Sequence, residues 1–465
     1  MSSKFKGCLV RYFKQYLYIF AHFSNHKYFQ KIQTWNNVTN APNKSLSSVS
    51  LTVYTSLSLS LCGVSLKMSQ MGEPQILQRR KNHLPHDIVL NILARLPVKS
   101  VTRFRCVCKS WNSSITTPYF ISTHLNNSKS NDDNDYVIHM PTWEDRCRIA
   151  TWEGRPLACM VAPSDTLVCT VALGRTFDRI SEVRIPFDFD SEFAQIVGSC
   201  NGLLCFATSG GNVIYLWNPN IRMFKRLPDT KRLGKLDSFQ LGFAYHSEND
   251  DYKVVRISHS QLGIPEIVSE VYTLSSDSWK KVVISLTIGI FLWHQNYHLP
   301  APLVSGALHW MAQNRGVGSR VILSFDVNSE TLRKLALPKY STHASPLIGL
   351  FKGKLALSTW EYNYGNSDFR YCIWMMKEYG VVESWNKLFV IGSFKQNIHW
   401  SAFTKYGSLI LCFVNHRVER KGFEFVLIDT ETLHEKKDPD IKYPSYVATF
   451  KESLLLLDGA NVVSY

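Results

Sequence analysis

The sequence predicts an α+β multidomain protein, in which a small all-α unit at residues 80–125 precedes an all-β, propeller-like domain of about six blades at residues 137–465. Three observations lead to this division. The chain has 465 residues, more than a single ordinary hydrophobic core holds. Residues 84–115 carry apolar side chains at helical spacing. Beyond residue 137, short apolar runs alternate with turn residues, and one pattern recurs at intervals of about 50 residues.

Residues 1–72 differ in composition from the rest of the chain. They contain eight Lys or Arg and no Asp or Glu, so they supply +8 of the net charge of +15. Residues 46–66 are uncharged and long enough to span a bilayer, but their apolar members alternate as in a strand. We therefore expect a disordered basic extension. The alternative is a transit peptide or membrane anchor, because the segment is basic and rich in Ser.

Residues 84–97 are predicted to form a short helix with more apolar surface than it can bury alone. Its two apolar stripes consist of Leu84, Ile88, Ile92 and Leu96 on one side and of Val89 and Leu93 about 100° further round the axis. Pro85 is tolerated in a first turn, and Pro97 ends the helix. One stripe can face a local core, whereas the other stays in water unless a partner covers it.

A second helix is expected from Val98 to Ile115. Its apolar residues fall on one continuous face, which comprises Val101, Phe104, Cys108, Trp111 and Ile115. Four basic residues lie off that face, namely Lys99, Arg103, Arg105 and Lys109. Two consecutive amphipathic helices with apolar surface left over indicate a docking module.

Residues 83–125 closely resemble the F-box. The matching residues are Leu84-Pro85, Ile88, Ile92-Leu93, Arg95 to Ser100, Arg103 to Trp111, Pro118-Tyr119-Phe120 and His124-Leu125. The resemblance implies binding to a Skp-type adaptor, which connects an F-box protein to a cullin-based ubiquitin ligase. The implied adaptor-binding residues are Leu84, Pro85, Ile88, Ile92, Leu96, Pro97, Val101, Phe104, Val107 and Trp111. Such adaptors are acidic, so the basic residues Lys99, Arg103, Arg105 and Lys109 are candidates for electrostatic steering. The alternative is a helical subdomain that packs only on itself.

The region after the helices is predicted to be a ring of similar β-sheets. Residues 126–136 form a polar linker. Corresponding strand positions are then Trp217, Tyr272, Phe325, Trp374 and Ile428. A period near 50 with four short strands per unit is typical of kelch-like propeller blades. A propeller covers both faces of each sheet by stacking blades, and we expect residues 446–459 to pair with the first strands and close the ring.

This second region resembles the F-box-associated domain of a large plant family of F-box proteins. The residues that carry the resemblance are 198–205, Trp217-Asn218-Pro219, 241–245, 251–256, 306–310 and 322–326. Together the two resemblances imply a plant substrate receptor of a Skp–cullin–F-box ubiquitin ligase. They imply as partners a Skp-type adaptor, a cullin reached through that adaptor and a protein substrate, which the sequence does not identify. The expected location is the cytoplasm or the nucleus, because that machinery resides there.

The sequence contains no recognisable catalytic or metal-binding constellation. We found no GxSxG, P-loop or HExxH motif. The eleven cysteines form no CxxC pair, and His294 with His298 is the best zinc candidate but lacks a third ligand. We therefore expect no catalytic residues, no metal and no cofactor. A nucleic-acid partner is not expected despite a pI near 9.2, because about half of the excess charge lies in one terminal segment. A membrane partner is not expected either.

Three alternative functions stay open at this stage. The chain could be an F-box scaffold that acts outside the ligase, a propeller enzyme, or a basic nucleic-acid binder. The sequence does not tell which rim of the propeller binds a substrate.

Overall fold

The computed structural model divides the chain into two compact units, with the boundary near residue 123. The structure describes residues 85–129, 136–141, 168–187, 189, 194–208, 210–230, 237–260, 267–282, 290–292, 299–314, 318–340, 345–363, 365, 368–394, 398–415, 422–437, 439–457, 459 and 461–462. The predictions for residues 1–72, Leu84 and the pair His294 and His298 lie outside these ranges. No helix in the described part of the chain is long and apolar enough to cross a membrane.

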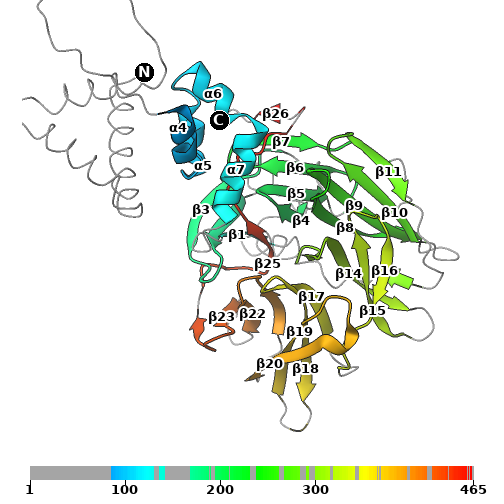
Figure 1. Ribbon diagram of the computed structural model, residues 1–465. Coiled ribbons are helices and arrows are strands. Elements are labelled where there is room, and N and C mark those ends of the chain that lie inside the picture. Colours follow the sequence, from blue (N-terminus) through cyan, green and yellow to red (C-terminus); the bar gives the residue numbers. More distant parts are fainter. Residues whose placement is uncertain are drawn as a thin grey trace, which may run out of the picture. The chain divides into compact units, whose positions relative to one another are not determined.

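The first unit is built from short helices (Figure 1), which are α4 (His86–Leu93), α5 (Val98–Phe104), α6 (Lys109–Ile115) and the start of α7 (Pro118–Lys129). Its interior is apolar and consists of Val89, Leu93, Ala94, Val98, Val101, Phe104, Trp111 and Ile115, each with less than a tenth of its surface exposed. Burial of this set stabilises helices that are too short to be stable alone in water.

The prediction of one continuous helix from Val98 to Ile115 was wrong. The helix breaks after Phe104, and Cys108 is extended, with φ −157° and ψ 161°, at the start of α6. The amides of Cys106 and Val107 bond to carbonyl oxygens three residues back, as in a tightening last turn. The break allows Phe104 and Trp111 to meet edge to face, with 5.6 Å between ring centroids, and this contact favours the broken form.

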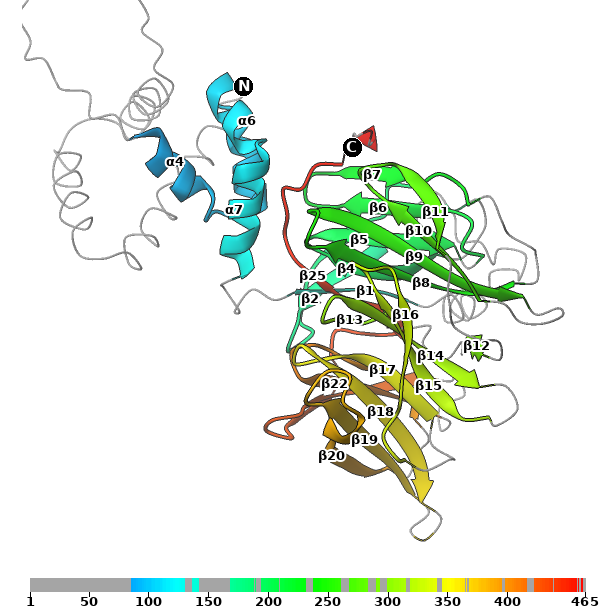
Figure 2. The same cartoon turned by 45° about the vertical axis from the view of Figure 1, so that its right-hand side comes forward.

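The second unit consists of six antiparallel sheets, which confirms the predicted all-β propeller with about six blades (Figures 1 and 2). Blade 1 contains β25 (Ser445–Phe450), β1 (Tyr136–Pro141), β2 (Val168–Leu173) and β3 (Arg179–Arg184); blade 2 contains β4 (Ala194–Cys200), β5 (Leu203–Thr208), β6 (Ile214–Asn218), β7 (Met223–Arg226) and β26 (Asn461–Val462); blade 3 contains β8 (Asp237–His246), β9 (Asp251–Ser260), β10 (Ile267–Thr273) and β11 (Ser278–Val282).

The remaining blades follow the same order along the chain. Blade 4 contains β12 (Ile290–Leu292), β13 (Leu303–Val304), β14 (Ala307–Asn314), β15 (Arg320–Asp326) and β16 (Leu332–Leu335); blade 5 contains β17 (Ser345–Phe351), β18 (Lys354–Asn363), β19 (Asp368–Met376) and β20 (Trp385–Phe394); blade 6 contains β21 (Ile398–Phe403), β22 (Ser408–Asn415), β23 (Gly422–Asp429) and β24 (Glu435–Lys437).

The repeat read from the sequence corresponds to one structural position. Trp217, Tyr272, Phe325, Trp374 and Ile428 all lie on the third strand of their blades, namely β6, β10, β15, β19 and β23. The predicted ring closure is also confirmed, because β25 pairs antiparallel with β1 from Tyr136↔Phe450 to Pro141↔Ser445. Blade 1 therefore combines strands from both ends of the domain.

The predicted linker at residues 126–136 needs a correction at both ends. Helix α7 runs to Lys129, and β1 already begins at Tyr136. The polar residues Asn126 to Lys129 continue a helix whose apolar residues Phe120 and Ile121 are buried, because tertiary packing overrides weak local propensity. Residues 130–135 lie outside the described ranges.

Candidate functional site

Helices α4 and α5 begin in the same way, each after a proline. Pro85 has φ −51° and ψ 143°, and Pro97 has φ −55° and ψ 146°. Their carbonyl oxygens accept hydrogen bonds from Val89 N at 3.2 Å and from Val101 N at 3.1 Å. Because proline presets its own φ and lacks an N–H that a helix start would leave unsatisfied, it suits these positions. Both prolines are exposed.

The structure decides which stripe of α4 faces inwards. Val89 and Leu93 are 6% and 2% exposed and pack into the unit, whereas Ile88, Ile92 and Leu96 are only partly buried. The hydrogen bond between His86 Nε2 and Ser114 Oγ, at 3.0 Å, ties the start of α4 to α6 and so holds this orientation. Three residues of the other apolar stripe, Ile88, Ile92 and Leu96, are thus left partly exposed.

The ten residues that resemblance assigned to adaptor binding fall into three groups. Val101, Phe104 and Trp111 are interior, and they support the surface without forming it. The residues that reach the surface are Pro85, Ile88, Ile92, Leu96, Pro97 and Val107; we call these six the docking surface. Leu84 lies outside the described ranges. Of the predicted residues that the structure describes, six therefore reach the exterior and three are buried.

The same helical unit carries an excess of positive charge. Lys99, Arg103 and Lys109 are exposed, and Arg105 is partly buried, with its Nε donating to Asn112 Oδ1 at 3.0 Å. Asp87 is the one acidic residue between positions 85 and 129. An uncompensated basic field attracts an acidic partner and raises its association rate.

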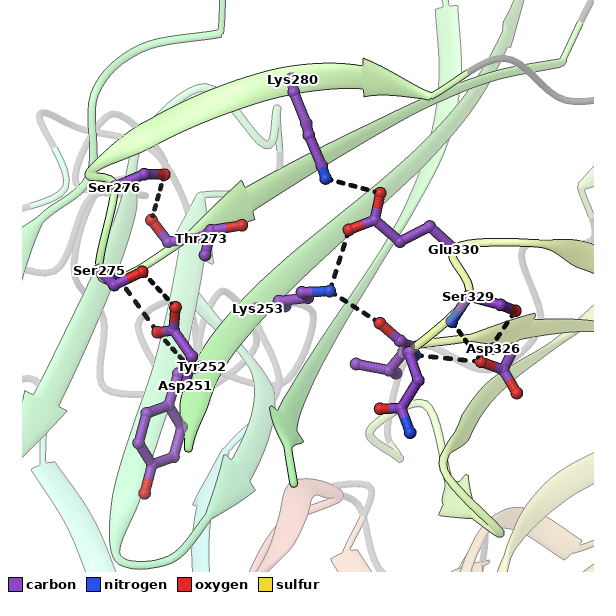
Figure 3. Close-up of polar contacts among 12 residues, drawn as sticks. Asp251, Tyr252, Lys253, Thr273, Ser275, Ser276, Lys280, Asp326, Ser329 and Glu330 are labelled. Carbon is purple, nitrogen blue, oxygen red and sulfur yellow. Dashed lines mark hydrogen bonds and ion pairs between the residues drawn. The ribbon is translucent and has the colours of Figure 1, made fainter. Parts of the chain in front are cut away.

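The propeller contains polar contacts at blade boundaries that the sequence analysis missed. In four of them a lysine of one blade pairs with an acid in the turn between the third and fourth strands of the next blade. The pairs are Lys225–Asp277 at 3.1 Å, Lys253–Glu330 at 2.9 Å, Lys352–Glu431 at 2.6 Å and Lys436–Asp178 at 2.5 Å. Figure 3 shows Glu330 between Lys253 and Lys280 of the preceding blade. A lysine in a strand or an acid in a turn is ordinarily solvated, so no local pattern marks these residues.

At the boundary between blades 4 and 5, hydrogen bonds between uncharged side chains take the place of the ion pair. Tyr379, in the turn between β19 and β20, lies 2.9 Å from His309 Nε2 and 2.8 Å from Ser324 Oγ. His309 Nδ1 is 3.0 Å from the carbonyl oxygen of Pro302, which can only accept, so Nδ1 carries the proton and Nε2 accepts from Tyr379. Burial lowers the pKa of His309 to about 4, which keeps the ring neutral.

Neither unit contains a candidate metal site among the described residues. These ranges contain no group of three or more His, Cys, Asp or Glu placed to hold a metal ion. His246, His259 and His309 are buried at separate positions, and His434 is exposed. The burial of the first three fits a structural role.

Comparison with known proteins assigns both units. Residues 82–123 match the F-box domain family, and residues 156–437 match the F-box associated beta propeller domain family. The chain belongs to the F-box proteins with this propeller domain. The strands extend past the propeller match at both ends, from Tyr136 to Val462.

Relatives of this F-box protein support the same assignment. Three proteins of Arabidopsis thaliana are each 28% identical to it: an F-box/kelch-repeat protein over 67% of this chain and 80% of its own length, an F-box protein over 68% and 75%, and F-box protein CPR1 over 66% and 73%. Among solved structures, a Porphyromonas gingivalis dipeptidyl peptidase 4 has a TM-score of 0.30 at 12% identity, covering 56% of this chain and 39% of that chain. Such a likeness is too low to add to the fold.

Proposed function

We propose that this F-box protein is the substrate receptor of a Skp–cullin–F-box ubiquitin ligase. In this role the docking surface binds the Skp-type adaptor, the adaptor links the chain to the cullin, and the propeller binds the protein to be ubiquitinated. The observation that carries the proposal is the partly exposed stripe of Ile88, Ile92 and Leu96, in a unit that has an apolar interior and exposed basic residues.

The physical basis is the apolar area left in water. Complete burial of a Leu or Ile side chain is worth about 1.5–3 kcal/mol, so the remaining exposure of each of the three partly buried residues offers at most roughly 1 kcal/mol to a partner. The exposed Lys99, Arg103 and Lys109 should orient the approaching adaptor and raise the association rate more than they raise the affinity.

The receptor contributes proximity and no chemistry of its own. It holds a substrate lysine within reach of the ubiquitin-carrying enzyme, which raises the effective concentration of the two reactants. We accordingly propose a non-catalytic subunit located in the cytoplasm or the nucleus, which imaging of a fluorescent fusion in plant cells would test.

The direct test is the double variant Ile92→Asp with Leu96→Asp in the full chain, measured for binding to a purified Skp-type adaptor. We expect affinity to fall by about a hundredfold, because two apolar contacts are replaced by carboxylates that must be desolvated. The matched control is Asn91→Asp, which adds a charge at an exposed position of the same helix and should bind nearly as well as the wild type.

Far-ultraviolet circular dichroism should show the same helix content in all three proteins, because none of the substituted residues belongs to the interior. A folded double variant that binds as well as the control would overturn the proposed docking surface. Co-purification of the cullin with the wild type but not the double variant separates the ligase from an F-box scaffold that acts outside it.

A further inference from the structure

The chain continues beyond the strand that closes the ring, and this continuation is bound to the neighbouring blade. After β25, residues 451–457 run in an extended conformation towards β26, which pairs with β7 at the outer edge of blade 2. Figure 2 shows this red segment passing one end of the blade 2 strands. Ser453, Leu454 and Leu457 are 0%, 4% and 1% exposed, so the segment is part of the folded domain. We call residues 451–457 the latch.

A side chain of blade 2 binds the backbone of the latch. The side chain of Asn218, at the end of β6, is fully buried, and its Nδ2 donates to the carbonyl oxygens of Ser453 at 3.1 Å and Leu455 at 3.0 Å. Its Oδ1 accepts from the amide of Asn220 at 3.0 Å. Both amide hydrogens are therefore committed to two carbonyl groups of the latch, which no acid or apolar side chain can reproduce.

A glycine gives the latch room to approach. Gly202, in the turn between β4 and β5, has φ +84°, and a Cβ at this position would lie 2.2 Å from Ser453 Cβ and 2.8 Å from the carbonyl oxygen of Lys451. Leu457 completes the contact by joining the apolar cluster of blades 2 and 3 that includes Leu203 and Leu216. Three features therefore hold the latch: the hydrogen bonds of Asn218, the space left by the missing side chain of Gly202, and the apolar contacts of Leu457.

The latch contributes polar contacts at one of the six blade boundaries. At the other five blade boundaries, a turn between the third and fourth strands bonds directly to the preceding blade, through Asp178, Asp277, Glu330, Tyr379 or Glu431. At the boundary between blades 1 and 2, Asn218 at the end of the third strand bonds to the latch, which follows the first strand of blade 1 in the sheet order, β25.

We propose that blade 2 contains a binding site for an extended peptide, that the chain's own residues 451–457 occupy it, and that the latch releases before β25 leaves β1. The seam of the propeller then opens in two stages. The first stage breaks the two hydrogen bonds of Asn218 and withdraws Leu457. The second stage breaks the six-residue pairing of β25 with β1.

Hydrogen–deuterium exchange of the full chain tests this order. In the variant Asn218→Asp, the carboxylate still accepts from the amide of Asn220 but cannot donate to the latch. We expect amides of residues 453–457 to exchange at least tenfold faster than in the wild type, while those of residues 447–449 in β25 keep their protection. Asn220→Ala is the matched control in the same turn, and it should leave the latch protected.

A second variant changes the latch itself and not blade 2. Leu457→Asp alters the latch and leaves Asn218 in place, and it should produce the same local increase in exchange. The proposal is overturned if the latch keeps its protection in Asn218→Asp. It is equally overturned if both variants lose protection in β25 and the latch together, or unfold the whole propeller, because the latch would then not be a separate stage.

Discussion

Lys253 of β9 and Glu330 of the turn after β15 form an ion pair across the boundary between blades 3 and 4, with 2.9 Å between Nζ and Oε1 and side-chain exposures of 6% and 14%. Lys253 also donates to the carbonyl oxygen of Val327 at 2.8 Å, and Lys280 reaches the second carboxylate oxygen at 2.9 Å (Figure 3). Burial alone would raise the pKa of Glu330, but hydrogen bonds from Lys280 and Lys253 outweigh it and hold that pKa below its usual value of 4.5.

Glu330→Gln should destabilise the propeller by about 2–3 kcal/mol, because it leaves the buried ammonium group of Lys253 without a counter-charge. Urea unfolding at pH 7 measures the loss. The matched control is Glu431→Gln, whose pair with Lys352 is 61% and 38% exposed and should cost less than about 1 kcal/mol. Equal losses would show that burial does not decide the strength of these contacts.

The effect of Glu330→Gln should also depend on pH. Because the folded-state pKa of Glu330 is depressed, its ionised form contributes stability above the unfolded-state pKa, and this contribution is lost as pH falls through the folded-state value. The difference in unfolding free energy between wild type and variant should therefore shrink below about pH 4. A difference that stays constant down to acid pH would exclude the ion pair as its source.

His139 should make the propeller sensitive to mild acid. Burial lowers its pKa to about 4, the ring packs near Phe177, and neither ring nitrogen has a hydrogen-bond partner in the part of the chain that the structure describes. In the unfolded chain His139 binds a proton near pH 6.5, whereas in the folded chain it stays neutral until about pH 4. The free energy of unfolding therefore falls as pH drops from 6.5 towards 4, and the loss is about 2 kcal/mol at pH 5. The variant His139→Phe should lose less stability between pH 7 and pH 5, and the exposed His434→Phe should behave as the wild type.

Gly242 of β8 is required by close packing between blades 3 and 4. A Cβ there would lie 2.7 Å from Trp310 Cζ2 and 2.8 Å from Leu308 Cδ1, and Trp310 Nε1 donates to the carbonyl oxygen of Leu241 at 3.1 Å. We expect Gly242→Ala to reduce the free energy of unfolding by about 1–3 kcal/mol through overpacking. Combining it with Leu308→Val should cost less than the sum of the two single changes; additive costs would place the strain elsewhere.

Lys99→Glu with Lys109→Glu should slow association with an acidic Skp-type adaptor, and this expectation depends on the proposed function. Both side chains are exposed, so they act through long-range attraction, and we expect a roughly tenfold lower association rate at low salt with little change in the dissociation rate. The difference should narrow as salt is raised to 0.5 M, where screening is strong. Stopped-flow mixing measures both rates, and an association rate that does not respond to salt would rule out steering.

Local periodicity in the sequence determined the fold class. Trp217, Tyr272, Phe325, Trp374 and Ile428 recur because each fills the same place on a third strand, and a strand or helix needs its apolar residues at a spacing that its own geometry dictates. The same reasoning located the docking helices and the closure of the ring by its last strands.

Only the tertiary structure decided which faces of these elements are buried and which distant residues pair. Both stripes of α4 are apolar, and only the folded unit shows that Val89 is buried whereas Ile92 stays partly exposed. Lys253 and Glu330 are 77 residues apart, and Asn218 and Ser453 are 235 apart. Such pairs form only after the ring has brought distant segments together, and because each depends on the positions of whole blades, no pattern within a window of neighbouring residues predicts it.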